Sequence, residues 1–353
     1  MESGRYYLLD AMRGTAALLV VAFHFGRIGV MAAPQGYIAV DFFFALSGFV
    51  IAAAYSDRLA GGLTLAKFAE IRLVRLYPMY AIGLLLGLIR PVGALLLHNQ
   101  IHLGPVEIST AFAFNAFMLP TPFSSSELFP LNGPGWSLFL EVAVNLIFAA
   151  FLFRQRKLVL IVVMVAGGLM TIWGAQIAGN LNVGWSWATL AGGAGRTLYS
   201  FTLGVLMSRM SLGLRRISCW ALILPALLAA VLCIAPPKSL QIPTDLLTAM
   251  VVCPLLLAAG AKIEVPIWMR PGAAFLGDLS YPLYAIHFPL IFIFGFAAAR
   301  VGLVGWPSLL LFLGLAVSTA VMAEKLVDTP LRRWLTARLR ARMSPLAFKQ
   351  ISP

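Results

Sequence analysis

The chain is divided into ten apolar segments, each about as long as a membrane-spanning helix. They lie near residues 7–28, 36–55, 76–97, 133–153, 158–178, 187–208, 217–235, 244–261, 275–298 and 306–327. About twenty helical residues cross the hydrocarbon core of a bilayer. Of the 353 residues, 61% are hydrophobic and 11% are charged, whereas about 25% are charged in soluble domains. The sequence therefore predicts an all-α, polytopic membrane helical bundle of about ten transmembrane helices.

Charge in the loops predicts the orientation of these segments. Most lysines and arginines fall in alternate loops and near the C-terminus, and positive charge marks the cytoplasmic side. Both termini are therefore expected in the cytoplasm, with a membrane domain over 1–330 and a basic tail over 331–353. The net charge of +13 then reflects topology and attraction to anionic lipid, and nucleic-acid binding is not expected. The apolar stretch 109–119 is too short to cross and predicts a re-entrant or interfacial piece.

The first apolar segment carries ionisable residues. Arg13 and His24 are eleven positions apart, so their side chains share one stripe of a helix and are separated by roughly 16 Å along its axis. Titratable groups at membrane depth are costly and usually face a bundle interior or a cavity, so this pair is a candidate functional site. The alternative is an ion pair without chemistry, in which Asp10 neutralises Arg13 and His24 is only a hydrogen-bonded helix contact.

The second apolar segment adds an acid and a hydroxyl. Asp41 lies near its outer end, and a short loop from the first segment would bring Asp41 beside His24. A carboxylate there would fix the tautomer of the imidazole and stabilise its charged form, as a general base requires. Ser47 lies about two turns deeper and is a candidate for the site. Its alternative role, together with Gly48, is close packing of helices.

Two arginines precede the third segment. Arg72 and Arg75 are three positions apart and share a helical face at the predicted cytoplasmic surface. Two guanidinium groups placed in this way suit phosphate, through forked hydrogen bonds as well as charge. The alternative is anchoring to lipid headgroups.

The fourth segment opens with a polar stripe. Ser137, Glu141 and Asn145 are four residues apart and share one face of the helix. Glu141 would lie about 12 Å below the outer mouth if the helix began near residue 133. A carboxylate at that depth indicates a function. Trp136 alone would be an ordinary interfacial aromatic residue.

The ninth segment carries a second histidine. Ser280, Tyr284 and His287 are spaced to share a stripe, and His287 would reach the middle of the membrane. His98 and His102 form an HxxxH pattern in an outer loop. No third ligand lies nearby in the sequence, so no metal site is expected.

Taken together, these motifs resemble membrane acyltransferase family 3, bacterial enzymes that O-acylate sugars of surface and secreted glycans. The resemblance covers residues 8 to about 330. The blocks that carry it are Leu9 to Gly14 with His24, Val40 to Phe49, Arg72 to Pro78, Trp136 to Leu138 with Glu141, Leu276 to Tyr281 with His287, and Glu324. The resemblance implies a multi-pass protein of the bacterial inner membrane and an acyl-CoA donor, usually acetyl-CoA, taken from the cytoplasm. It also implies that Arg13, His24 and the arginine pair are essential.

The resemblance and the residues together give a mechanistic hypothesis. His24, oriented by Asp41, would remove the proton from an acceptor hydroxyl as that oxygen attacks the thioester, and a transient acyl-histidine is the rival version. Glu141 would assist at the catalytic centre. Arg13, Ser47 and the pair Arg72 and Arg75 would hold the donor, while Trp136, Tyr284 and His287 would contact a carbohydrate or glycolipid acceptor. Membrane lipid is a further expected partner, and dimerisation is left open.

Two other classes of function compete with this hypothesis. Ten crossings with buried charge also suit a transporter or flippase for a lipid-linked sugar, although the sequence has no internal repeat of the kind many transporters have. An intramembrane serine protease would use Ser47 with His24 or His287. Donor-dependent formation of an ester by the purified protein separates the acyltransferase from the transporter, and failure of a serine-reactive fluorophosphonate to label Ser47 would exclude the protease.

Overall fold

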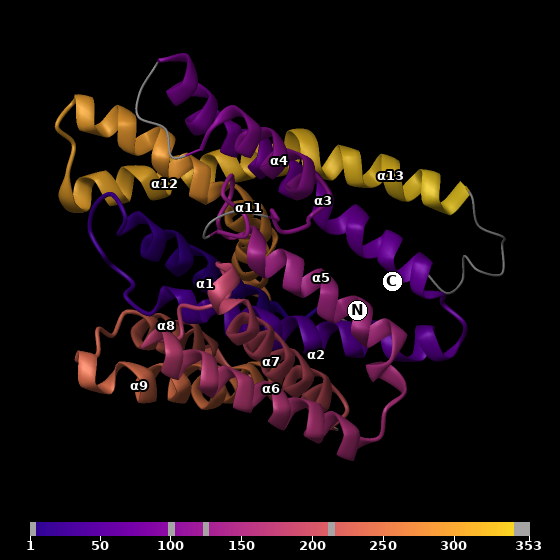
Figure 1. The fold of residues 1–353 in the computed structure, drawn as a ribbon. Helices are drawn as coiled ribbons and strands as arrows, with labels where there is room; N and C mark the ends of the chain where they lie inside the picture. The colour runs from indigo at the N-terminus through magenta and orange to yellow at the C-terminus, as the bar shows by residue number, and fades with distance from the viewer. Residues whose placement is uncertain (1–4, 98–102, 123–126, 211–215, 342–353) are drawn as a thin grey trace.

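The computed structural model describes residues 5–97, 103–122, 127–210 and 216–341, and in this part the chain is a bundle of α-helices (Figure 1). The helices are α1 (Tyr7–Phe25), α2 (Ala39–Ala60), α3 (Leu65–Leu96), α4 (Pro105–Ala116), α5 (Gly135–Ala150), α6 (Lys157–Ala178), α7 (Leu190–Ser208), α8 (Ile223–Leu232), α9 (Gln241–Leu247), α10 (Cys253–Ala261), α11 (Arg270–Arg300), α12 (Gly305–Ala323) and α13 (Thr329–Ala341). Two-residue strands β1 (Arg216–Ile217) and β2 (Ile263–Glu264) pair in parallel.

Helix α11 lies in the interior of the bundle and contacts α1, α3 and α12. Figure 1 shows α6, α7, α8 and α9 gathered on the opposite side of the molecule from α12 and α13. A π-helical turn at Thr248–Val252 joins α9 to α10, and another at Glu324–Asp328 joins α12 to α13. The described part of the predicted basic tail is therefore a helical continuation of α12, and it packs beside α3.

Each of the ten predicted segments contains a helix, but not all of these helices are equally suited to crossing a membrane. By length and composition, seven helical stretches of the described chain could span a bilayer. The other three belong to the fourth, sixth and seventh segments: α5 has 16 residues, α8 has 10, and α7 has 19 but carries the buried charge of Arg196. The stretch predicted as re-entrant or interfacial lies in α4, a helix of 12 residues, which is too short to cross.

The connections between helices meet in two groups, as alternate crossings require. On the predicted outer side, the Gln35 amide donates to the Leu232 carbonyl, and the Leu128 amide donates to the Trp185 carbonyl. On the predicted cytoplasmic side, the Arg209 guanidinium donates to the carbonyls of Leu152, Phe153 and Gln155, and β1 pairs with β2. This grouping is consistent with ten crossings.

Glycines set the closest helix crossings. A Cβ on Gly14 of α1 would lie 2.5 Å from the Leu276 carbonyl oxygen, and a Cβ on Gly277 of α11 would lie 2.6 Å from the Asp10 carboxyl carbon. Gly48 of α2 and Gly204 of α7 leave no room for a side chain where those two helices cross. Small residues let helix backbones approach in this way within membranes. The packing role considered for Gly48 is therefore confirmed.

Candidate active site

A cavity of about 470 Å³ opens among α1, α2, α3, α5 and α11. Its volume lies within the range of about 300–1,000 Å³ that small-molecule sites occupy. The cavity contains most of the residues that the sequence singled out. It is lined by Arg13, Val40, Phe43, Phe44, Leu46, Ser47, Val50, Ile51, Ala54, Tyr55, Arg58, Arg72, Arg75, Leu76, Ser137, Leu138, Glu141, Ser280, Tyr281 and Tyr284.

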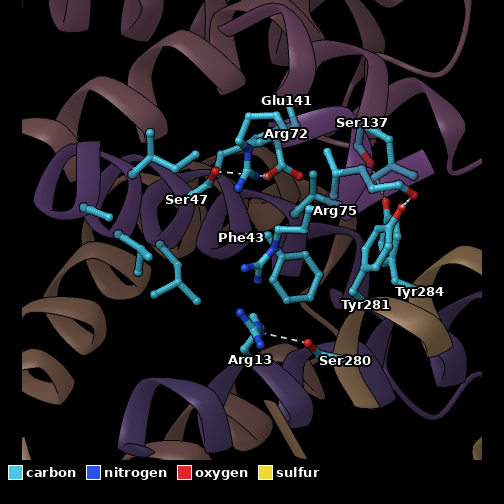
Figure 2. Close-up of a pocket in the computed structure, with 18 of the residues that line it drawn as sticks. Arg13, Phe43, Ser47, Arg72, Arg75, Ser137, Glu141, Ser280, Tyr281 and Tyr284 are labelled. Carbon is cyan, nitrogen blue, oxygen red and sulfur yellow. Dashed lines mark hydrogen bonds and ion pairs between the residues drawn. The ribbon is translucent and has the colours of Figure 1, made fainter. Parts of the chain in front are cut away.

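Four arginines face this cavity, at the end of the bundle where α1, α3 and α11 begin. They are Arg13 from α1, Arg58 from the last turn of α2, and Arg72 and Arg75 from α3. Figure 2 shows the side chains of Arg13, Arg72 and Arg75 directed into the same space. Glu141 is the one carboxylate among the lining residues. The cavity is therefore strongly cationic, and Arg58 is a member that sequence reasoning missed.

Arg72 is anchored within the cavity, whereas Arg75 is not. The Arg72 guanidinium lies 3.4 Å from the Glu141 carboxylate, which also accepts a hydrogen bond of 3.0 Å from the Ser47 hydroxyl. Arg72 is buried, and its Nε has no hydrogen-bond partner. Arg75 is exposed and has no ion pair or hydrogen bond within the described parts of the chain. These arginines thus retain donor capacity for an anion.

Glu141 was predicted to assist at the catalytic centre, about 12 Å below the outer mouth of the membrane domain. The structure instead places its carboxylate against Arg72 and Ser47, inside the cationic cavity. Ser47 likewise faces this cavity, and its hydroxyl bonds to Glu141 and to neither histidine.

Arg13 lines the cavity and is also held by its neighbours. Its guanidinium donates to the Ser280 hydroxyl at 2.8 Å and to the Gly277 carbonyl at 2.6 Å, and lies 3.4 Å from the Asp10 carboxylate. The close glycine crossing of α1 and α11 creates these contacts, because it brings the α11 backbone within reach of Arg13. The ion pair proposed as the alternative is therefore present, and it positions Arg13 at the cavity.

His24 and His287 form a hydrogen-bonded pair. The His287 Nδ1 lies 2.8 Å from the Tyr284 carbonyl oxygen, so this nitrogen carries the proton and donates it. In the neutral ring Nε2 then accepts, and it lies 3.1 Å from the His24 Nδ1. His24 Nδ1, which is also 3.0 Å from the Val20 carbonyl oxygen, must carry its own proton. The lone pair of His24 therefore resides on Nε2, which is free to accept a proton.

Asp41 does not lie beside His24, and the predicted pairing of these two residues is wrong. The Asp41 carboxylate accepts two hydrogen bonds from Arg196 of α7, from Nη2 at 2.5 Å and from Nε at 3.1 Å. Both residues are buried. Since an unpaired arginine inside the bundle would be very costly, Arg196 is the stronger partner for the acid. His287 takes the orienting position that Asp41 was expected to fill.

Tyr284 connects the cavity with the histidine pair. It lines the cavity, and its hydroxyl lies 2.6 Å from the Ser137 hydroxyl (Figure 2). Its ring centroid lies 5.7 Å from that of His287. The ring of Phe43 lies 5.8 Å from Tyr284 on the cavity side. His24 itself does not line the cavity. Its imidazole contacts His287, which in turn contacts Tyr284.

Trp136 is not part of this cavity. Its ring lies 5.7 Å from the Arg196 guanidinium carbon and 6.4 Å from the Phe44 ring centroid, and the side chain is buried. Trp136 therefore covers the Asp41–Arg196 ion pair. His98 and His102 lie outside the described residues, and the described residues contain no cluster of three or more metal-binding side chains.

Comparison with known proteins identifies the family of this chain. A family model described as an acyltransferase domain (Acyl_transf_3) matches residues 6–323. The chain belongs to this acyltransferase family. A stretch of 160 residues is 39% identical to "Protein 2 in picA locus" of Rhizobium radiobacter and covers 41% of this chain and 81% of that protein. No solved structure matches the chain.

The family assignment makes the protein a multi-pass membrane acyltransferase, in place of the transporter and the protease considered as alternatives. Among the residues in the matched region, the structure brings together Arg13, Ser47, Arg72, Arg75, Glu141 and Tyr284 around the cavity. It places His24 and His287 together just beyond it.

Proposed function

We propose that this acyltransferase moves an acyl group, preferably acetyl, from cytoplasmic acyl-CoA to a hydroxyl of a lipid-linked or secreted carbohydrate at the bacterial inner membrane. The observation that carries the proposal is the position of the cationic cavity. Tyr284 lines this cavity and its ring contacts His287, which is hydrogen-bonded to His24. Acyl-CoA has phosphate groups at one end and a thioester at the end of a long arm. The arginines of the cavity would match the phosphate end, and the histidine pair would match the thioester end.

The cationic end of the cavity suits the phosphate groups of the donor. Arg58 lies in the last turn of α2, and Arg72 and Arg75 lie one turn apart in the first half of α3. Guanidinium groups bind phosphate through charge and paired hydrogen bonds. The pantetheine arm would pass Phe43 and Ser47 toward Tyr284, because those residues line the rest of the cavity. Displacing the Phe43 and Tyr284 rings would admit the thioester to His24.

The chemistry follows from the protonation of the histidine pair. The His24 Nε2 takes the proton of the acceptor hydroxyl as the hydroxyl oxygen attacks the thioester carbonyl. The carbon–sulfur bond then breaks, CoA leaves as the thiolate, and the proton held on His24 passes to that sulfur. The His287 Nε2 accepts from the His24 Nδ1 and stabilises the imidazolium that forms in between. In the rival version, His24 Nε2 attacks the thioester itself, the carbon–sulfur bond breaks and CoA leaves as the thiolate. The acyl group then passes from His24 to the acceptor hydroxyl, whose proton goes to the thiolate.

Purified protein in nanodiscs, supplied with radiolabelled acetyl-CoA and a glycolipid fraction, tests the proposal. We expect ester formation by the wild type and its loss in His24→Ala. Mass spectrometry of protein given donor without acceptor separates the two versions, because only the rival leaves an acyl group on His24. Full transfer by His24→Ala would overturn both versions.

A further inference from the structure

The outer end of α1 carries an arginine directly beside the histidine pair. Arg27 lies in the turn that follows α1, and its backbone amide donates to the His24 carbonyl at 3.1 Å. Its guanidinium carbon lies 5.2 Å from the ring centroid of Phe288, and the ring of Phe288 lies 5.2 Å from that of His24. Arg27 is thus one aromatic ring away from the proposed base, on the side opposite the donor cavity.

A second arginine continues this row from another helix. Arg90, near the outer end of α3, lies with its guanidinium carbon 4.2 Å from the ring centroid of Phe292. Phe292 in turn lies 5.2 Å from Phe288. Cation–π contact with a ring face restrains a guanidinium without using up its hydrogen-bond donors. The two arginines are therefore held in place beside a row of rings that begins at His24.

Neither guanidinium is neutralised by a close partner. Arg27 and Arg90 are both exposed, and in the described stretches of the chain neither makes an ion pair or a side-chain hydrogen bond. Glu127, in the loop before α5, interacts with both charges at longer range. Burial raises the pKa of the Glu127 carboxyl, and the two arginines act in the opposite direction. Two cations thus face a single, partly buried acid.

We infer that Arg27 and Arg90 form an acceptor subsite that binds an anionic group of the glycan, either a phosphate or a sugar carboxylate. This inference rests on the proposed function and names the class of acceptor. A neutral sugar would leave two outer guanidinium groups without a counter-charge, whereas a phosphate or carboxylate takes forked hydrogen bonds from them. Pre-positioned donors also reduce the cost of ordering the site on binding. Bound there, the glycan presents a hydroxyl to His24 Nε2.

The competing role of such arginines is anchoring to lipid headgroups, and the chain offers a matched control for it. Arg300, at the outer end of α11, lies with its guanidinium carbon 4.3 Å from the Phe296 ring centroid. Like Arg27 and Arg90, it is exposed and has an aromatic contact of the same kind. It is not part of the row that reaches His24.

The test measures acyl transfer in nanodiscs at saturating acetyl-CoA, with a glycolipid fraction as acceptor. Arg27→Gln and Arg90→Gln should each raise the acceptor KM by about tenfold to a hundredfold, the usual loss for a hydrogen bond to a charged group, and leave the donor KM unchanged. Glu127→Gln should lower the acceptor KM because it removes the competing acid. Arg300→Gln should change neither constant. Arg27→Lys and Arg90→Lys keep the charge and should give intermediate values if the proteins fold.

Modified acceptors identify the anion. One acceptor preparation has its phosphate groups removed, and another has its carboxylates reduced to alcohols. The preparation that has lost the recognised anion should give wild type and Arg27→Gln the same acceptor KM. The inference is overturned if the wild type transfers acyl groups while Arg27→Gln and Arg90→Gln keep the acceptor KM of Arg300→Gln, which would assign the arginines to lipid headgroups. Absence of transfer by the wild type to any acceptor would instead overturn the proposed function.

Discussion

At the scale of single residues, the partner of His24 decides how the site works. The sequence singled out His24 and His287, because both are ionisable groups in apolar segments. It assigned the orienting role to Asp41 because Asp41 is near in the sequence. The structure gives that role to His287, 263 positions away, since the rotation of α11 directs His287 toward His24. Such a rotation follows from packing and cannot be deduced from a helical stripe alone.

Arg196 carries a signal in the sequence that points to the correct partner of Asp41. A lone arginine in an apolar segment requires an acid inside the bundle, and Asp41 is a rare acid at membrane depth. Weighing the cost of the unpaired arginine therefore favours Arg196 over His24 as the partner of Asp41. The cavity-lining residue Arg58 has no comparable signal, because it lies among the other basic residues of a predicted cytoplasmic loop.

The pairing of the histidines predicts what loss of His287 does. In His287→Ala, nothing fixes the proton on His24 Nδ1 except the shared Val20 carbonyl, so the imidazole can adopt the unproductive tautomer. We expect kcat to fall by about 10²-fold to 10⁴-fold, the range found when general-base catalysis is disabled. The KM for acyl-CoA should not change. Steady-state kinetics of folded protein checks this, and an unaltered kcat would show that His287 has no role in orienting His24.

The arginines of the cavity predict a loss of donor binding. Arg72→Gln and Arg75→Gln should each raise the KM for acyl-CoA by about tenfold or more, because each removes a hydrogen bond to a charged group. The effect should shrink at high salt for the exposed Arg75 more than for the buried Arg72. Arg338→Gln is the control, since Arg338 lies over Trp334 on α13, away from the cavity lining. Equal KM values for all three variants would mean that these arginines bind lipid.

At the scale of helices, glycine contacts determine where the side chains of the site lie. The sequence placed the helices well, because long apolar runs identify them directly, but it does not specify which helices touch. The crossing of α2 and α7 at Gly48 and Gly204 holds Asp41 against Arg196 and holds Ser47 at the cavity. The crossing of α1 and α11 does the same for Arg13 and Ser280.

The α2–α7 crossing predicts opposite effects of the same substitution at two glycines. Gly48→Ala forces a methyl group against the backbone of Phe201 and should destabilise the fold by about 1–3 kcal/mol, as overpacking does. Gly314→Ala in α12 meets no atom within 4 Å and should be neutral or stabilise by up to about 1 kcal/mol, because alanine is the better helix former.

Thermal unfolding followed by size-exclusion chromatography in detergent compares these two proteins. A Gly48→Ala protein as stable as Gly314→Ala would mean that α2 and α7 are not so closely packed.

At the scale of the whole molecule, the donor and acceptor regions lie at opposite ends of the bundle. The cationic cavity is formed where α1, α3 and α11 begin, and Arg27 and Arg90 lie where α1 and α3 end. The histidine pair lies between the two. In the proposed mechanism, orientation in the membrane therefore matters, because the proposed donor, acyl-CoA, would enter from one side and the proposed glycan acceptor from the other.

The sequence predicted ten crossings from apolar length alone, and α5, α7 and α8 are the weak members of that count. At 1.5 Å per residue α5 is about 24 Å long, less than the roughly 30 Å of a hydrocarbon core. The hydrogen bonds between loops nevertheless place its two ends in opposite groups, with Leu128 bonded to Trp185 and Leu152 bonded to Arg209. Those contacts are between distant segments, so only the folded chain could supply them.

Single cysteines test both the count and the orientation. In a variant without the three native cysteines, Lys238→Cys and Val301→Cys should react with a membrane-impermeant maleimide added to spheroplasts, because both lie in connections on the predicted outer side. Arg156→Cys and Lys262→Cys should react only after the membrane is permeabilised. All four native side chains are exposed, so burial would not hide the thiols. Labelling of Arg156→Cys from outside would show that α5 does not cross.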